Sequence, residues 1–446
     1  MATAADLPTP LDIAGLAEGY RTGALDPVAI TETCLARIAT DDPALRAFIT
    51  VAADSAKEQA HESRRRFAAG RAFGPLDGIP IGIKDNIDVA SLPCTAGTAA
   101  FRTRMPERDA RAVTRLRQGG AVLLGKLNMH EGALGATTDN PVYGRCMNPA
   151  RPGYTPGGSS GGSAVAVAAG LCAASLGTDT MGSVRVPAAY CGVYGFKPSH
   201  DAARGEGVVP LSFTLDSVGP LARTIEDLAT LADVLHEGPM RSSDRSRTIS
   251  LAGFRIGVPR QLDAIALTAP VASAFASFLD ALRGAGALVT SVDLPNWEPT
   301  KARRAGLLIS EAEGASYYTQ ALGAGLPGLS SEFAAMLRYP AQAGLDRVIG
   351  AYALIDAVRQ SYLDAFAEVD LIALPTTPQP SFPHGVEVPV NQADCTGLAN
   401  FARAPAVSLP VATDDLPVGV QLMAAPGDDC RLMAIAAAVD RLIERG

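Results

Sequence analysis

The feature that most constrains the fold is a repeated alternation of short apolar segments with longer amphipathic ones. The apolar segments are only a few residues long, which is typical of buried strands and too short for helices. Buried strands that alternate with helices predict an α/β fold in which helices cover both faces of a central sheet. We interpret 121–124, 171–176, 254–258, 288–292, 371–374 and 418–422 as strands, and 112–118, 164–170, 224–235, 270–283 and 430–443 as helices.

The organisation of the chain predicts one large domain. The 446 residues would allow about three domains of average size. No repeat of fixed period and no low-complexity linker divides them, so we expect a single domain over 1–446. Within it, 1–70 is expected to be helical, 75–200 to form the functional core, and 201–446 to supply the rest of the sheet, its helices and pocket segments. The polar segment Arg241–Arg247 predicts a surface loop.

Composition argues against several classes of function. Hydrophobic residues make up 48% and charged residues 19%, the balance of a folded protein with a large core. The formal charge of -8 argues against nucleic acid as the main partner, because phosphate binding needs a basic face. The 7 cysteines lack CxxC spacing, which predicts buried thiols in a reducing compartment.

The chain shows no sign of a targeting or membrane segment. Residues 1–12 have neither the basic region nor the apolar core of a secretory signal. The longest apolar run, 164–176, is shorter than the roughly 20 residues that cross a bilayer. We therefore expect a cytoplasmic protein with no membrane partner.

The run Gly157–Ser163 contains only glycine and serine. A flexible linker is one interpretation of such a run. However, it opens directly into the apolar helix predicted at 164–170, and a flexible tether has no reason to lie against a core helix. Glycines also permit unusual backbone angles and close approach of other groups. The run is therefore expected to form part of a site.

A second glycine- and serine-containing turn, Gly177–Ala188, follows the apolar run 171–176. In α/β folds, strands deliver reactive groups into turns of this kind. Successive backbone N–H groups there can converge on an anion. Asp179 and Arg185 could pair and hold the turn closed. For an isolated Gly-Ser pair, a plain strand-to-helix connection remains the simpler interpretation.

Standard nucleotide and metal motifs are missing from the sequence. No Walker A lysine precedes Ser163, no GxGxxG follows a strand, and the 5 histidines lie far apart without HExxH. We therefore expect no cofactor and no metal. The segment 158–162 matches GxSxG, the nucleophile elbow, with Ser160 at its centre. The elbow must end a strand, and three prolines precede it instead, so Ser160 is a minority candidate.

A lysine offers another way to activate a serine, because a neutral amine can accept the hydroxyl proton. Lys84 follows the apolar stretch 79–83, where an ordinary surface lysine would be out of place. Burial would keep its amine neutral. The alternative role, a structural ion pair with Asp85 or Asp88, is equally compatible with this residue taken alone.

Together these segments resemble the amidase signature family between about residues 75 and 198. The matching elements are GIPIGIK ending at Lys84, PGGSSGGSA with Ser159, and GTDTMGSVRVPA with Ser183. The resemblance implies a large mixed central β-sheet covered on both faces by helices. It also implies an amidohydrolase that cleaves an amide C–N bond through an acyl-enzyme. Weaker similarity continues at 219–224 and 374–378.

The family's catalytic residues carry over to three positions. The resemblance implies that Ser183 is the acylating nucleophile, that Ser159 is a bridging serine after a cis peptide, and that Lys84 is the base. It further implies an oxyanion hole from the backbone N–H groups of Thr180, Met181, Gly182 and Ser183, support from Asp179, Arg185 and Ser160, and a substrate pocket lined by Met129, Met181 and Tyr143.

One departure from the family concerns substrate choice. Many members have glycine where this chain has Met181. The thioether adds adaptable apolar bulk. We therefore expect a small-molecule substrate, with apolar or aryl amides, anilides or carbamates preferred over small polar amides. Apolar patches on a helix-rich exterior would also support a homodimer.

The resemblance leaves other functions open. One is the amidase-type subunit of a multi-subunit amidotransferase or of a carboxybiuret-hydrolase-like complex. The tRNA-dependent glutaminase subunit typically carries an Asn-Leu-Ala-Arg-Tyr-Asp-Gly-like stretch after Glu-Ala. The segment Glu311–Tyr318 departs from that stretch, which argues against this role. A catalytically inactive homologue is disfavoured because Lys84, Ser159 and Ser183 are intact.

Overall fold

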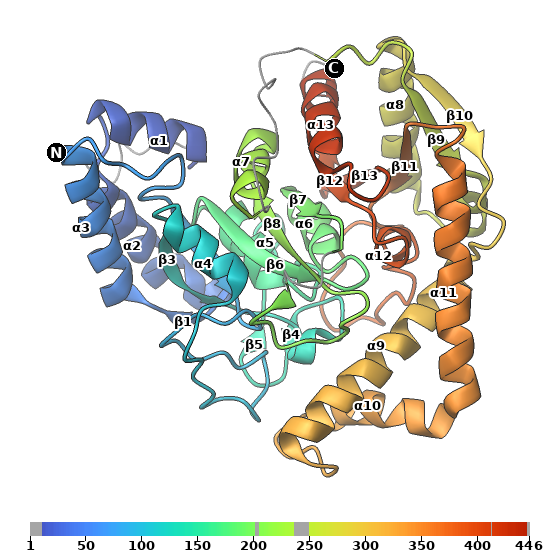
Figure 1. Cartoon of the computed structure of the whole chain (residues 1–446), viewed down its shortest axis with the longest axis horizontal. Coiled ribbons are helices and arrows are strands. Elements are labelled where there is room, and N and C mark those ends of the chain that lie inside the picture. Colours follow the sequence, from blue (N-terminus) through green and yellow to red (C-terminus); the bar gives the residue numbers. More distant parts are fainter. Residues whose placement is uncertain (1–10, 201–204, 236–248, 412, 444–446) are drawn as a thin grey trace.

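The computed structural model describes residues 11–200, 205–235, 249–411 and 413–443. Within these residues eleven strands form one mixed sheet, accompanied by thirteen α-helices (Figure 1). This arrangement confirms the predicted α/β fold with a large mixed sheet. The segment Arg241–Arg247 lies outside the described residues.

The strands and helices alternate along most of the chain. The strands are β1 (Phe48–Val51), β2 (Pro80–Lys84), β3 (Val122–Leu127), β4 (Asp139–Asn140), β5 (Gly144–Arg145), β6 (Ala174–Asp179), β7 (Tyr194–Lys197), β8 (Ser217–Ala222), β9 (Arg255–Pro259), β10 (Leu288–Val292), β11 (Leu371–Pro375), β12 (Ala406–Val411) and β13 (Val418–Met423). The helices are α1 (Ile13–Thr22), α2 (Pro27–Leu45), α3 (Ala53–Ala68), α4 (Arg111–Gln118), α5 (Gly161–Ala168), α6 (Arg185–Cys191), α7 (Ile225–Leu235), α8 (Ala269–Gly284), α9 (Pro299–Leu322), α10 (Ser331–Ala343), α11 (Leu345–Ala365), α12 (Gly397–Phe401) and α13 (Asp429–Ile443).

The sheet combines parallel and antiparallel pairs in the order β1-β3-β2-β6-β8-β7-β12-β13-β11-β9-β10. β2 is parallel to both of its neighbours, β3 and β6, whereas β8 joins β6 in antiparallel register. Every residue of β2 and β6 is buried. The ends of these two adjacent strands therefore bring together the two segments that the sequence singled out.

The predicted strand at 171–176 lies three residues later in the structure, at Ala174–Asp179. The polar residues at its end belong to the strand because Thr178 and Asp179 pair with Val218 and Ser217 of β8. Pairing with a neighbour thus outweighs local apolar character. In contrast, the strand predicted at 288–292 coincides with β10.

The Gly/Ser run leads into α5 as predicted, and one of its glycines is required by packing. A side chain at Gly162 would begin 2.4 Å from the Asn128 carbonyl oxygen and 2.6 Å from the Ala47 carbonyl oxygen. Only glycine permits such an approach. The run is therefore part of the packed core rather than a linker.

Helices α9, α10 and α11 form a group at the side of the sheet (Figure 1). Most buried apolar residues of α9 and α11, together with Trp297 before α9, belong to a core cluster separate from the one around β2 and β6, whereas Phe333 and Leu337 of α10 belong to a third cluster. None of these three helices was predicted from the pattern. They matter for the site because α9 carries residues that line its cavity.

The cysteines are mostly buried, as predicted: six are buried and Cys430 is exposed. Among the described helices, none combines the length and apolar character of a membrane span. We propose that the chain is one domain, since a single sheet takes strands from both of its halves.

Candidate active site

Lys84 ends β2, and its side chain is completely buried. The Nζ atom donates hydrogen bonds to Ser159 Oγ at 2.8 Å and to Thr178 Oγ1 at 2.7 Å. Burial lowers the pKa of Lys84 to about 7, although the carboxylates of Asp216 and Asp179 act to raise it. At neutral pH a substantial fraction of this amine is therefore uncharged.

The alternative role of Lys84 in an ion pair with Asp85 or Asp88 is wrong. Asp85 instead pairs with the buried Lys126, whose Nζ lies 3.4 Å from its carboxylate. Asp88 forms a bidentate pair with Arg104. Both carboxylates are thus engaged by other cations, and Lys84 contacts hydroxyl groups.

Ser159 follows a cis peptide bond after Gly158, which matches the family's pattern. The loop is held from both sides by hydrogen bonds. Thr138 Oγ1 donates to the Gly157 carbonyl at 2.8 Å, and the His130 amide donates to the Ser159 carbonyl at 3.1 Å. These contacts place the Ser159 hydroxyl against the Lys84 amine.

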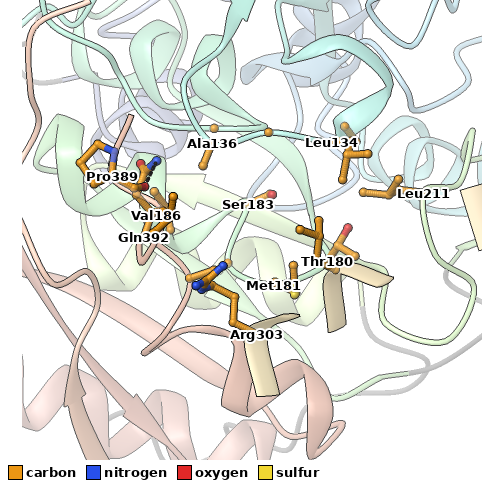
Figure 2. A pocket seen from close by; sticks show the side chains of 17 residues that line it. Leu134, Ala136, Thr180, Met181, Ser183, Val186, Leu211, Arg303, Pro389 and Gln392 are labelled. Atoms are coloured by element: carbon orange, nitrogen blue, oxygen red, sulfur yellow. Dashed lines mark hydrogen bonds between the residues drawn. The ribbon is translucent and has the colours of Figure 1, made fainter. Parts of the chain in front are cut away.

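Ser183 lies in the loop between β6 and α6 and lines a cavity (Figure 2). The Ser160 amide donates to the Ser183 carbonyl at 3.2 Å, which joins the two glycine-rich loops. In the described part of the chain, the Ser183 hydroxyl has no hydrogen-bond partner. The structure therefore contains the hydrogen bond between Lys84 and Ser159. Ser183 lies on the adjacent loop, and its hydroxyl is not hydrogen-bonded to the Ser159 hydroxyl.

The predicted pair of Asp179 and Arg185 is formed and fully buried, with Nη2 3.0 Å from Oδ1. Burial is the largest single influence and would raise the pKa of Asp179. The charge and hydrogen bonds of Arg185, the Lys197 charge and the Asn400 hydrogen bond together lower the pKa to about 2. Arg185 also donates to the side chains of Asn400 and Gln421. Both charges are thus surrounded by polar partners, as a buried pair requires.

The same carboxylate organises the loop that bears Ser183. Asp179 accepts hydrogen bonds from the amides of Gly182 at 2.7 Å and Val184 at 3.2 Å. The Gly182 N–H is therefore engaged, and we leave it out of the oxyanion hole. Among the described residues, the amides of Thr180, Met181 and Ser183 have no acceptor.

Ser160 has a structural role. Its hydroxyl donates to the Thr178 carbonyl at 3.1 Å and accepts from the Thr178 amide at 3.2 Å. The side chain is completely buried and is not part of the cavity wall. The nucleophile-elbow interpretation of Ser160 is therefore not supported by the geometry, whereas its supporting role fits it.

Asp216 is a residue of the site that the sequence analysis missed. It accepts a hydrogen bond from Thr180 Oγ1 at 2.6 Å and from the amides of Leu211 and Ser212. Burial raises the pKa of Asp216 to about 6, and its hydrogen bonds and the Lys84 charge oppose this. No local signal marks it, since it reaches the site only because β8 pairs with β6.

The cavity beside Ser183 has a volume of about 150 Å³ and is mainly apolar (Figure 2). Gly158 and the loop Thr180–Ser183 form one side of the cavity. Two residues of α9 contribute the facing wall. The lining residues are Ala133, Leu134, Gly135, Ala136, Gly158, Thr180, Met181, Gly182, Ser183, Val186, Leu211, Arg303, Leu307, Pro389, Val390, Gln392 and Ala393.

Of the three expected substrate-binding residues, only Met181 lines this cavity. Met129, in the loop that follows β3, is completely buried in a separate apolar cluster with Phe101 and Tyr318. Tyr143 lies between the short strands β4 and β5, outside the cavity wall. The wall residues that the analysis missed come from distant segments, chiefly Arg303 and Gln392.

Comparison with known proteins identifies the family of the chain. The family model described as Amidase matches residues 29–433. The chain belongs to the amidase family. Its similarity to other members extends over nearly its whole length, so the family assignment covers the sheet, the site and the cavity alike.

Relatives of this amidase-family chain include different kinds of protein. The A subunit of glutamyl-tRNA(Gln) amidotransferase from Chloroflexus aurantiacus is 35% identical, over 95% of this chain and 94% of the relative. The crystal structure of an amidase has a TM-score of 0.89 and 33% identity, covering 97% of this chain and 100% of its own. Native peptide amidase from Stenotrophomonas maltophilia has a TM-score of 0.82 and 31% identity, covering 97% of both chains.

Proposed function

We propose that this chain hydrolyses the C–N bond of amides through a Ser183–Ser159–Lys84 triad and an acyl-enzyme. The observation that carries the proposal is the fully buried Lys84 amine, which lies 2.8 Å from the Ser159 hydroxyl and is in direct contact with no carboxylate of the described residues. An amine in this setting can take up a proton near neutral pH.

The reaction begins when Ser183 Oγ attacks the substrate carbonyl. The Ser183 proton passes to Ser159 Oγ while the Ser159 proton passes to Lys84 Nζ, after a rotation that turns the Ser183 hydroxyl toward Ser159. The C–N bond then breaks, and the leaving amine takes the proton back along the same path. Water cleaves the acyl-enzyme by the same steps and releases the acid.

Thr178 orients the Lys84 amine during these steps. Its hydroxyl oxygen accepts hydrogen bonds from Lys84 at 2.7 Å and from Asn86 at 3.2 Å. In the neutral amine one N–H bond is thus directed at Thr178, which leaves the lone pair free to face Ser159. The amides of Thr180, Met181 and Ser183 would stabilise the negative charge on the carbonyl oxygen.

A second part of the proposal concerns the preferred substrate. It is supported by the apolar cavity wall around Met181. Gly306 on α9 makes room for this side chain, since a Cβ there would lie 2.7 Å from Met181 Sδ. The thioether therefore occupies space beside Ser183. We propose apolar or aryl amides, anilides or carbamates in preference to small polar amides.

The test is hydrolysis of a panel of aryl amides, alkyl amides and carbamates by the purified chain. Ser183→Ala and Lys84→Ala serve as controls. We expect amide cleavage that both substitutions abolish. Cleavage that persists in both variants would refute the triad, and no cleavage of any amide would refute the function.

A second candidate is a component of a multi-subunit amidotransferase, which the 35% identity to the glutamyl-tRNA(Gln) amidotransferase relative favours. The segment that departs from that relative's pattern has structural roles here: Glu313 accepts a hydrogen bond from the Thr214 amide at 3.1 Å, and Tyr318 lies in an apolar cluster. Cleavage of an anilide by the chain without any added protein would favour the stand-alone enzyme. Cleavage only with a partner would favour the multi-subunit role.

A further inference from the structure

One cationic side chain in the cavity wall has no part in the hydrolysis proposed above. Arg303 of α9 points into the cavity below Ser183 (Figure 2). Most other wall residues are apolar or glycine. A guanidinium among apolar groups is costly to keep unless a partner of opposite charge or suitable acceptors are available.

The hydrogen bonds of the polar wall residues separate those that are engaged from those that are available. Thr180 gives its hydroxyl proton to Asp216, and Gln392 uses both ends of its amide on protein atoms. Among the described residues, the Ser183 hydroxyl and the terminal nitrogens of Arg303 have no protein partner. A ligand in the cavity would therefore meet the Ser183 hydroxyl and the Arg303 guanidinium.

A salt bridge on the Nε side of the guanidinium holds Arg303 in place. Its Nε donates to Asp394 Oδ1 at 2.5 Å, and the two side chains are 11% and 3% exposed. The other oxygen of Asp394 accepts from Thr300 at 3.2 Å. A guanidinium has five N–H donors in a planar fork. The salt bridge through Nε therefore orients the fork and leaves its Nη donors to a ligand.

We propose that Arg303 binds a carboxylate of the substrate, so that this enzyme prefers amides that bear a carboxylate over neutral amides of the same shape. The inference rests on the proposed amide hydrolysis and names a substrate class for the same site. Two parallel hydrogen bonds to one carboxylate give a guanidinium its specificity for this group. An anchor at a fixed position would also orient the scissile carbonyl toward Ser183.

The size of the cavity limits the distance between the carboxylate and the amide. Its volume of about 150 Å³ is below the roughly 300–1,000 Å³ of pockets for drug-sized ligands. A short spacer is therefore expected. The carboxylate could belong to the acyl part or to the amine part of the substrate, and the test has an arm for each.

The competing role for Arg303 is purely structural, with Asp394 connecting α9 to the segment before α12. A structural role would change activity on charged and neutral substrates by the same factor. The ratio of kcat/KM for a charged amide to that for its neutral twin therefore separates the two roles.

The acyl-side arm compares succinanilate with 4-methylpentananilide, in which an isopropyl group replaces the carboxylate. The amine-side arm compares N-butyryl-4-aminobenzoate with N-butyryl-4-isopropylaniline. We expect wild-type kcat/KM to favour the charged member of one arm by at least about tenfold. The ratio should fall to about one in Arg303→Met and to an intermediate value in Arg303→Lys.

The matched control is Arg304→Met, which removes the same charge from the exposed neighbouring position on α9. It should keep the wild-type ratio. If Arg303→Met fails to fold with Asp394 unpaired, the double variant Arg303→Met, Asp394→Asn removes both charges and takes its place. A wild-type ratio near or below one in both arms, or a wild-type preference that survives in Arg303→Met or in the double variant, overturns the inference.

A binding experiment distinguishes failure of the proposed hydrolysis from failure of carboxylate binding by Arg303. If the wild-type chain cleaves none of the four anilides, calorimetric titration of Ser183→Ala with succinanilate and with N-butyryl-4-aminobenzoate decides the inference. Binding of a charged anilide that is lost when Arg303→Met is added supports it. Equal affinity for the neutral twin, or no measurable binding of either charged anilide, overturns it.

Discussion

The two sides of Ser183 differ in how their polar groups are satisfied. On the inner side, Lys84, Ser159 and Thr178 are buried and hydrogen-bonded to one another. On the cavity side, Arg303 is paired through one edge only and its remaining donors face the space where a substrate would lie. On the inner side the polar groups satisfy one another, whereas on the cavity side the Arg303 Nη donors have no partner among the described residues. We propose that the inner side supplies the chemistry and the cavity side the specificity.

The largest effect is expected from Ser183→Ala, which removes the proposed nucleophile. Loss of a catalytic serine lowers turnover by orders of magnitude, and we expect a decrease of at least about 10³-fold in kcat. Anilide hydrolysis measures it. Labelling by a fluorophosphonate should also disappear in Ser183→Ala and persist in Ser160→Ala. The opposite labelling result would make Ser160 the nucleophile.

A large effect on stability is expected from Asp179→Asn, which leaves Arg185 buried without its counter-charge. Breaking a buried pair in this way typically costs about 3–5 kcal/mol. Urea unfolding measures the change. The control is Asp280→Asn, because Asp280 forms an exposed pair with Arg283 that should contribute about 0–1 kcal/mol. Equal losses in the two variants would show that the inner side does not depend on this pair.

The pH dependence tests whether Lys84 acts as a neutral base. Because the pKa of Lys84 is lowered to about 7, its protonated form predominates below that value. We expect kcat/KM to fall about tenfold per pH unit below pH 7 and to level off above it. Asp216→Asn removes a charge that raises this pKa, so the midpoint should move to lower pH. A flat profile from pH 5 to pH 9 would contradict the role.

The smallest effect is expected on the cavity side, from Met181→Gly. Removing the thioether beside Gly306 enlarges the cavity without touching the triad. We expect the preference for aryl over small polar amides to change several-fold, roughly the contribution of one or two buried methylene groups. Ratios of kcat/KM across the panel measure it. An unchanged ranking of substrates would show that Met181 does not select them.

The catalytic segments could be found from the sequence because each carries a local contradiction. Lys84 ends an apolar strand, and Ser159 lies in a glycine-rich run that enters a core helix. A charged residue or a flexible segment next to a buried element is unusual in a purely structural role, so it indicates a candidate functional site. Arg303 and Asp216 carry no such contradiction, since an arginine on a helix and an aspartate in a loop are ordinary surface residues.

Helices α9–α11 show the same limit for the fold. Helices α9 and α11 form no clean amphipathic pattern, because they contact each other, α10 and α12 from several directions. β8 was also missed as a strand, since Gly219 and Pro220 interrupt its apolar residues. Its place is determined by pairing with β6 and β7, which no local pattern encodes.

The sequence by itself determined the α/β class and the residue types for serine chemistry, because both follow from short-range patterns. Only the tertiary structure decided which groups contact each buried lysine. Lys84 ends β2, and Lys126 lies in the adjacent strand β3. Both side chains are completely buried. Lys126 has the Asp85 carboxylate at 3.4 Å, whereas Lys84 has hydroxyl groups. Burial lowers the pKa of Lys84, and the hydroxyl groups that contact its amine come from distant parts of the chain.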